Sequence, residues 1–134
     1  MDTRKTRTWA EVSLGALRHN VAEMRRALPE SCGLLGVVKA DAYGHGACEI
    51  AAALHECGCR YLAVACPQEA LALRQAGETM PILILGAVDA AFASDMAAND
   101  LTLSVECAET GRALSAALHR GERLRIHLKL DTGM

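Results

Sequence analysis

Short apolar runs alternate with helical segments along most of this 134-residue chain. The runs have the length and branched residues of buried strands, and apolar residues in the segments between them recur at helical spacing. Strands that alternate with helices form parallel βαβ units. The sequence predicts strands at 34–38, 61–65, 82–85, 101–105 and 124–130, and helices at 14–28, 47–57, 67–75, 89–98 and 106–119.

This order of elements predicts an α/β fold. The repeats contain no Gly-x-Gly-x-x-Gly turn, which argues against a dinucleotide-binding fold. About five parallel strands alternating with helices fit a partial (β/α)8 TIM-type barrel better. Residues 8–12 alternate like a strand but precede the repeat. We therefore expect residues 1–12 to belong to another sheet and residues 13–134 to form the N-terminal part of a barrel.

The last predicted strand alternates between apolar and polar residues. Period two sends the two sets to opposite faces of a sheet. The polar face fits either the inner side of a barrel or the solvated face of an edge strand. The apolar set is Leu124, Ile126, Leu128 and Leu130, and the polar set is Arg125, His127, Lys129 and Asp131.

Composition and charge exclude several classes of protein. A net charge of −2 offers no basic excess for a phosphate backbone, so we expect no nucleic-acid partner. No apolar run is long enough to cross a bilayer, and no signal peptide is recognisable, so we expect a cytoplasmic protein without a membrane partner. The six cysteines include no C-x-x-C pair. Reduced, buried thiols are therefore expected, without disulfides or a metal.

Lys39 is the first candidate for chemistry because it directly follows the apolar pair Val37 and Val38. A lysine at the carboxyl end of a buried strand can be desolvated, which disfavours its charged form and frees the amine to attack a carbonyl. A solvated lysine at a strand end fits the same pattern. Tyr43 follows four residues later in a glycine-punctuated loop, 41–46, whose backbone could approach a ligand closely.

The ten residues from Val37 to Gly46, VVKADAYGHG, closely resemble the cofactor-lysine signature of the alanine racemase family. The resemblance extends to residues 8–12, 69–74, 81–86 and 127–134, and so covers almost the whole chain. It implies that Lys39 binds pyridoxal 5′-phosphate (PLP) covalently and exchanges the substrate α-proton on one face. It also implies that Tyr43 helps to hold the cofactor phosphate, and that Lys129 corresponds to a lysine that is carbamylated in some members.

The same resemblance implies a function, an isomerase that interconverts L-alanine and D-alanine as a homodimer. The chain corresponds to the early part of a typical member, and residues 1–12 would belong to that protein's separate C-terminal β domain. The substrate-positioning arginine and the opposite-face tyrosine, which the partner subunit contributes, would lie outside it. We therefore expect an N-terminal fragment that is inactive alone. The alternatives are a serine or broad-specificity racemase, another PLP barrel protein, or an inactive truncated PLP-binding scaffold.

Overall fold

The computed structural model describes residues 8–133. Five strands form one sheet in chain order, and every neighbouring pair is parallel. The strands are β1 (Leu35–Val37), β2 (Tyr61–Val64), β3 (Ile82–Ile84), β4 (Leu101–Val105) and β5 (Arg125–Leu128). The predicted number, order and direction of the strands are therefore confirmed.

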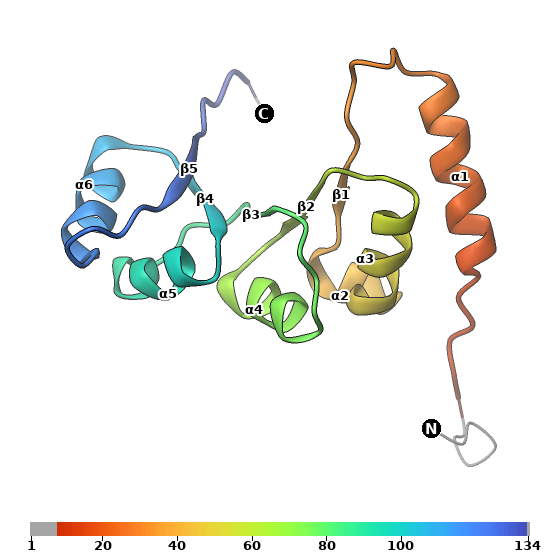
Figure 1. Ribbon diagram of the computed structural model, residues 1–134, viewed down its shortest axis with the longest axis horizontal. Coiled ribbons are helices and arrows are strands. Elements are labelled where there is room, and N and C mark those ends of the chain that lie inside the picture. Colours follow the sequence, from red (N-terminus) through yellow and green to blue (C-terminus); the bar gives the residue numbers. More distant parts are fainter. Residues whose placement is uncertain (1–7, 134) are drawn as a thin grey trace.

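The helices that connect the strands follow one side of the sheet, so that strands and helices together form an arc (Figure 1). Within residues 8–133, no helix lies on the inner side of the arc, and α1 stands at one end beside α3. This arrangement is that of a partial (β/α)8 barrel. The helices are α1 (Leu14–Arg26), α2 (Lys39–Gly44), α3 (Ala47–Glu56), α4 (Pro67–Gln75), the 3₁₀ turn η2 (Ala90–Phe92), α5 (Ala93–Ala98) and α6 (Ala108–Ala117).

The N-terminal segment differs from its prediction. Residues 8–13 form no strand, and none of the five strands pairs with them. A strand needs a hydrogen-bonded neighbour, and the described part of the chain supplies none here. Ser13 caps α1, because its hydroxyl oxygen accepts the Ala16 N–H at 3.1 Å. Membership of residues 1–12 in another sheet stays a prediction, and residues 1–7 lie outside the described range.

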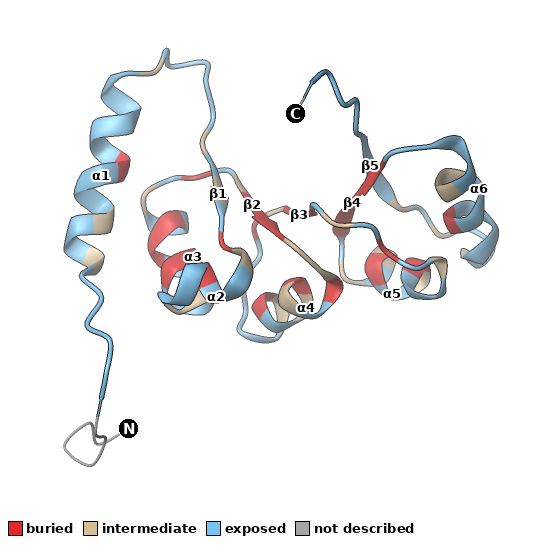
Figure 2. Ribbon diagram, turned by 180° about the vertical axis from the view of Figure 1, so that it is seen from behind, coloured by how far each residue is buried: buried red, intermediate tan, exposed pale blue. Residues whose placement is uncertain are grey.

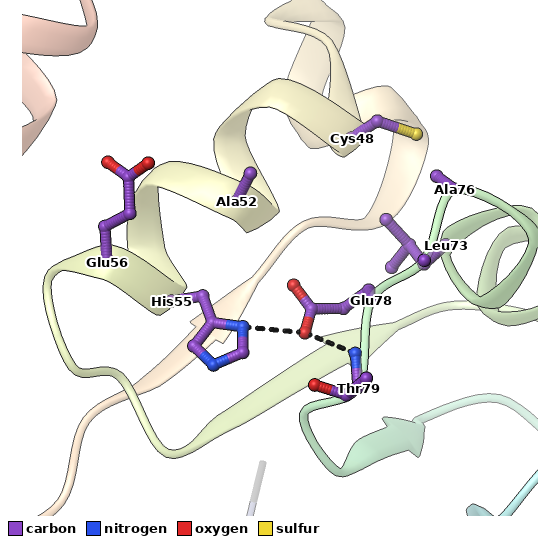
Figure 3. A pocket seen from close by; sticks show the side chains of 9 residues that line it. Cys48, Ala52, His55, Glu56, Leu73, Ala76, Glu78 and Thr79 are labelled. Carbon is purple, nitrogen blue, oxygen red and sulfur yellow. Dashed lines mark hydrogen bonds and ion pairs between the residues drawn. The ribbon is translucent and has the colours of Figure 1, made fainter.

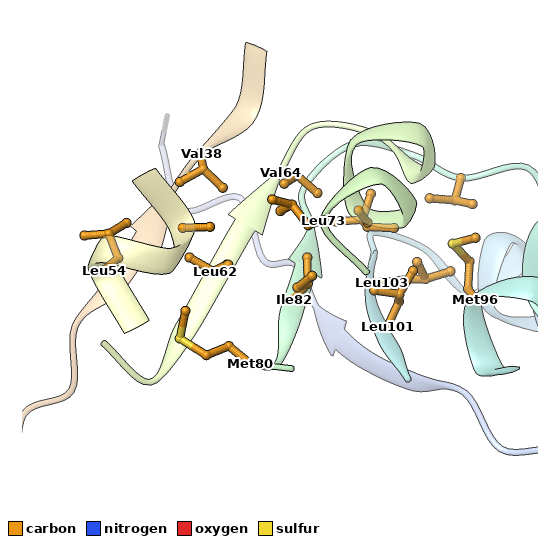
Figure 4. Packing of buried hydrophobic residues seen from close by; sticks show 14 of the residues in the cluster. Val38, Leu54, Leu62, Val64, Leu73, Met80, Ile82, Met96, Leu101 and Leu103 are labelled. Carbon is orange, nitrogen blue, oxygen red and sulfur yellow. The ribbon is translucent and has the colours of Figure 1, made fainter. Parts of the chain in front are cut away.

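The hydrophobic core lies between the sheet and its helices. Buried residues cluster where the strands face α3, α4 and α5 (Figure 2). Leu62, Ile82 and Leu103 are fully buried and belong to the outward-facing set of the three middle strands (Figure 4). Each such side chain contributes about 1.5–3 kcal/mol of hydrophobic stabilisation. Gly36 faces the same way, because a Cβ there would lie 2.5 Å from the Leu54 side chain of α3.

The inner side of the arc is lined by the alternate residues. Ala63, Leu83 and Thr102 are paired in register across β2, β3 and β4 and are buried. The Tyr61 ring of β2 lies 6.2 Å from the His127 ring of β5, although two strands separate them in the sheet. The sheet is therefore strongly curved, and the polar set of β5 faces its inner side. The polar face of β5 lies on the inner side of the arc, and because β5 is also the edge strand and all four of its residues are exposed, that face is solvated.

A network of polar contacts ties the loops at the amino ends of the strands. The Arg74 guanidinium donates hydrogen bonds to the carbonyls of Glu78, Met80, Asn99 and Asp100 at 2.8–3.2 Å. The Glu78 carboxylate accepts the N–H groups of Thr79 and Met80, both at 2.7 Å. It also contacts His55 at 3.0 Å, and Figure 3 shows this contact and the one to Thr79. Burial lowers the pKa of Arg74. These contacts fix the entries to β3 and β4.

At the carboxyl ends of the strands, the backbone at Gly86 lies very close to the backbone at Ala65. Its N–H donates to the Ala65 carbonyl at 3.1 Å, and an added Cβ would lie 2.5 Å from that same oxygen. Gly86→Ala is therefore expected to destabilise the protein by about 1–3 kcal/mol, because a backbone atom must move. Urea unfolding would measure this change.

Gly111→Ala in α6 is the matched control, because its Cβ would lie 3.6 Å from Val105. It should stabilise slightly, by up to about 1 kcal/mol. Equal stability of both variants would contradict the close-approach explanation.

The six cysteine thiols are all free, but the expectation that they are buried is only partly met. Cys59 is buried, and burial raises the pKa of its thiol. Cys32, Cys48 and Cys107 are exposed, because each lies in a loop or at a helix start rather than under the sheet. Within residues 8–133, no cluster of His, Cys, Asp or Glu could hold a metal ion, and no helix is long and apolar enough to span a membrane.

Candidate active site

Lys39 lies at the carboxyl edge of the sheet, one residue beyond the last hydrogen bond between β1 and β2. That bond runs from the Val38 N–H to the Ala63 carbonyl at 2.8 Å. Alternation along β1 assigns Lys39 to the inner side, with Leu35 and Val37. The residue is half-buried. Within residues 8–133 its amine makes no hydrogen bond or ion pair, so it is available to a ligand.

The segment after Lys39 is a left-handed helical turn rather than the predicted loop. Four consecutive residues, Ala40 to Tyr43, have φ between 51° and 56° and ψ between 39° and 50°. This conformation costs roughly 1–2 kcal/mol for each residue with a Cβ. Hydrogen bonds offset the cost: the Ala42 N–H donates to the Val38 carbonyl at 2.9 Å, and the Asp41 carboxylate accepts the Ala47 N–H at 2.7 Å. The turn thereby joins β1 directly to α3.

Tyr43 closes this turn and is 61% exposed. It lies in the same short helix, α2, that begins at Lys39. Sequence and structure agree that these two residues belong to one local unit at the strand end. A tyrosine in this position can donate a hydrogen bond to an anion bound at the sheet edge.

Lys129 also lies at the carboxyl edge, but at the other end of the sheet. Its backbone N–H donates to the Val105 carbonyl at 2.9 Å, which continues the ladder between β4 and β5 by one residue. The side chain is exposed. Within residues 8–133, no hydrogen bond or ion pair links Lys129 to Lys39 or Tyr43. Lys39 and Tyr43 therefore share the turn that follows β1, and Lys129 lies at the same edge of the sheet after β5.

The family model for the N-terminal domain of alanine racemase matches residues 12–134. The chain belongs to the alanine racemase family. The curated relative alanine racemase 1 of Oceanobacillus iheyensis is 45% identical over 127 residues, which is 94% of this chain and 34% of that protein. The chain thus spans about a third of the length of the curated alanine racemases that it matches.

Solved structures give the same result for the fold. An alanine racemase of Clostridium difficile 630 superposes with a TM-score of 0.92 at 40% identity, covering 97% of this chain and 34% of that one. A histidine racemase from Leuconostoc mesenteroides subsp. sake superposes at 0.80 with 29% identity, over 86% of this chain and 31% of that one. The family assignment and the partial TIM barrel are confirmed, and the matches support a racemase family.

Glu69 lies next to the candidate site, and no role was predicted for it from the sequence. It lies in the first turn of α4, and its carboxylate contacts the backbone beside Lys39. Glu69 and Ala40 are 29 residues apart, so no local sequence pattern predicts that they form a hydrogen bond. Only the adjacency of β1 and β2 in a parallel sheet could have indicated that the loops after these two strands meet.

Proposed function

We propose that this chain is the cofactor-binding N-terminal part of a PLP-dependent amino-acid racemase that interconverts L-alanine and D-alanine. The observation that carries the proposal is the position of Lys39, half-buried at the carboxyl edge of a partial TIM barrel with an amine that makes no ion pair within residues 8–133. Active sites of this barrel fold lie at that edge.

The side chains at this edge fit PLP in their chemistry. The Lys39 amine can condense with an aldehyde, and the exposed Tyr43 hydroxyl can donate to a phosphate. When bound, PLP supplies an electron sink that stabilises negative charge at the substrate α-carbon. Lys129 is proposed as a support residue, which carbamylation would convert from a cation to an anion.

In this proposal Lys39 moves a proton on one face of the substrate α-carbon. Racemisation requires a second base on the opposite face, because one base gives exchange without inversion. Tyr61 does not suit this role, since it is the first residue of β2, at the amino end, and its ring packs against His127. We therefore propose that the second base lies outside residues 8–133, in a homodimer on the partner subunit.

Reductive trapping tests the proposal directly. The protein is incubated with PLP, reduced with borohydride and digested, and the modified peptide is identified by mass spectrometry. The chain contains three lysines, Lys5, Lys39 and Lys129, so the assignment is unambiguous. We expect the label on Lys39. Label on another lysine would reject the site, and no label would favour an inactive scaffold.

Substrate specificity requires a separate measurement. The similarity to a histidine racemase supports, as a second candidate, a racemase for an amino acid other than alanine on the same framework. Racemisation of alanine, serine and histidine should be compared in the protein as its natural gene encodes it. A preference for alanine supports the first proposal, and a preference for either of the others supports the second.

A further inference from the structure

The carboxylate of Glu69 joins two backbone segments that separate beside Lys39. Its Oε1 accepts the Ala40 N–H at 2.8 Å, and its Oε2 accepts the Ala65 N–H at 2.7 Å. Ala40 directly follows Lys39, and Ala65 directly follows β2. One half-buried side chain of α4 thus connects the residue after the candidate cofactor lysine to the end of the neighbouring strand.

Both N–H groups need an acceptor because the ladder between β1 and β2 stops here. In a continued parallel ladder, the Ala65 N–H would donate to the Val38 carbonyl. That carbonyl instead accepts the Ala42 N–H, which begins the left-handed turn. Glu69 supplies the missing acceptor to Ala65, and a second one to Ala40 at the point where the chain leaves the sheet.

A carboxylate is specifically suited to this position. Both neighbours are donors, and an ionised carboxylate presents acceptors on both oxygens. A glutamine of the same shape would direct an NH₂ group at one of the two N–H groups and leave that donor unsatisfied. The negative charge is also favourable in the first turn of α4, near the positive end of the helix dipole.

We propose that Glu69 is a positioning residue for Lys39. By holding Ala40 against the end of β2, it fixes the backbone from which the Lys39 side chain extends, and it keeps the left-handed turn closed. This role rests on the proposed function, since it concerns how readily the Lys39 amine captures PLP.

Glu69→Gln tests the role in the protein as its natural gene encodes it. The rate at which Lys39 captures PLP is followed by reduction with borohydride at timed intervals and peptide mass spectrometry. We expect capture about tenfold slower than in the parent protein, because one backbone donor loses its partner and the turn loosens. The melting temperature is measured in parallel.

Glu78→Gln is the matched control. Glu78 also accepts two backbone N–H groups, those of Thr79 and Met80, but at the amino ends of the strands. Because the single oxygen Oε1 of Glu78 accepts both N–H groups, a glutamine can keep both hydrogen bonds. Glu78→Gln should therefore lower the melting temperature less than Glu69→Gln and leave the capture rate unchanged. Equal capture rates in Glu69→Gln and Glu78→Gln would overturn the positioning role. A parent protein that captures no PLP on Lys39 would instead reject the proposed function.

If Glu69→Gln does not fold, the inference can still be tested by amide hydrogen exchange in the unaltered protein. In the unaltered protein, the Ala40 and Ala65 N–H groups should exchange slowly, as do those of the β1–β2 ladder. Exchange of the Ala40 N–H at the rate of a free loop would overturn the inference, because Glu69 would then not hold that segment.

Discussion

Lys39→Ala is expected to abolish covalent capture of PLP and to lower racemase activity by at least roughly 10³-fold. The amine is both the proposed attachment point and the proposed acid and base on one face, so no neighbouring group replaces it. The fold should persist, because a half-buried lysine just past a strand end contributes little packing energy. Borohydride trapping, a racemisation assay and circular dichroism measure these three effects.

Lys129→Ala is the control for this experiment. Lys129 lies on the same edge of the sheet but follows β5, at the opposite end from β1. The variant should still capture PLP on Lys39, even if its activity falls. An unchanged level of trapped PLP in Lys39→Ala would show that another amine is used, and the proposed site would be wrong.

Arg74→Ala is expected to destabilise the protein by about 3 kcal/mol, since hydrogen bonds from a charged donor are each worth roughly 1.5–3 kcal/mol and are not additive. Four backbone carbonyls in the loops before β3 and β4 share this one guanidinium. Removal leaves them without that donor and loosens both strand entries. Urea unfolding monitored by circular dichroism measures the free-energy change.

Two further variants show whether the contacts of Arg74 matter or merely its charge. Arg74→Lys keeps the charge but cannot span the four carbonyls, so an intermediate loss is expected. Arg112→Ala removes an exposed arginine that pairs only loosely with Glu109 at 3.5 Å, and should cost less than about 1 kcal/mol. A loss in Arg74→Ala as small as that in Arg112→Ala would refute the structural role.

The fold could be predicted largely from sequence because its signals are local. Each strand is a short apolar run, and chain order alone determines the parallel sheet once helices intervene. The segment 89–98 is less regular than predicted, because Asp89 caps a 3₁₀ turn, Ala90–Phe92, before the short helix α5 begins. Residues 8–12 alternate like a strand but form none, because an alternating pattern forms a strand only beside a partner strand.

The candidate site could be predicted only in part. Lys39 and Tyr43 carry a recognisable motif, so their common location was expected. The left-handed turn between them was not, because alanine, aspartate and tyrosine have no intrinsic preference for positive φ over a run of four residues. The hydrogen bonds that stabilise this turn include a long-range one, from the Ala40 N–H to Glu69, and no local sequence pattern indicates that contact.

The ring contact between Tyr61 and His127 bears on the route by which a small molecule could reach Lys39. These two side chains, with Ala63, Leu83 and Thr102, occupy the interior of the arc. In the proposed function, these side chains would lie between a molecule bound at Lys39 and the amino ends of the strands. We therefore expect the substrate and product of the proposed reaction to enter and leave at the carboxyl edge of the sheet, where Lys39 lies.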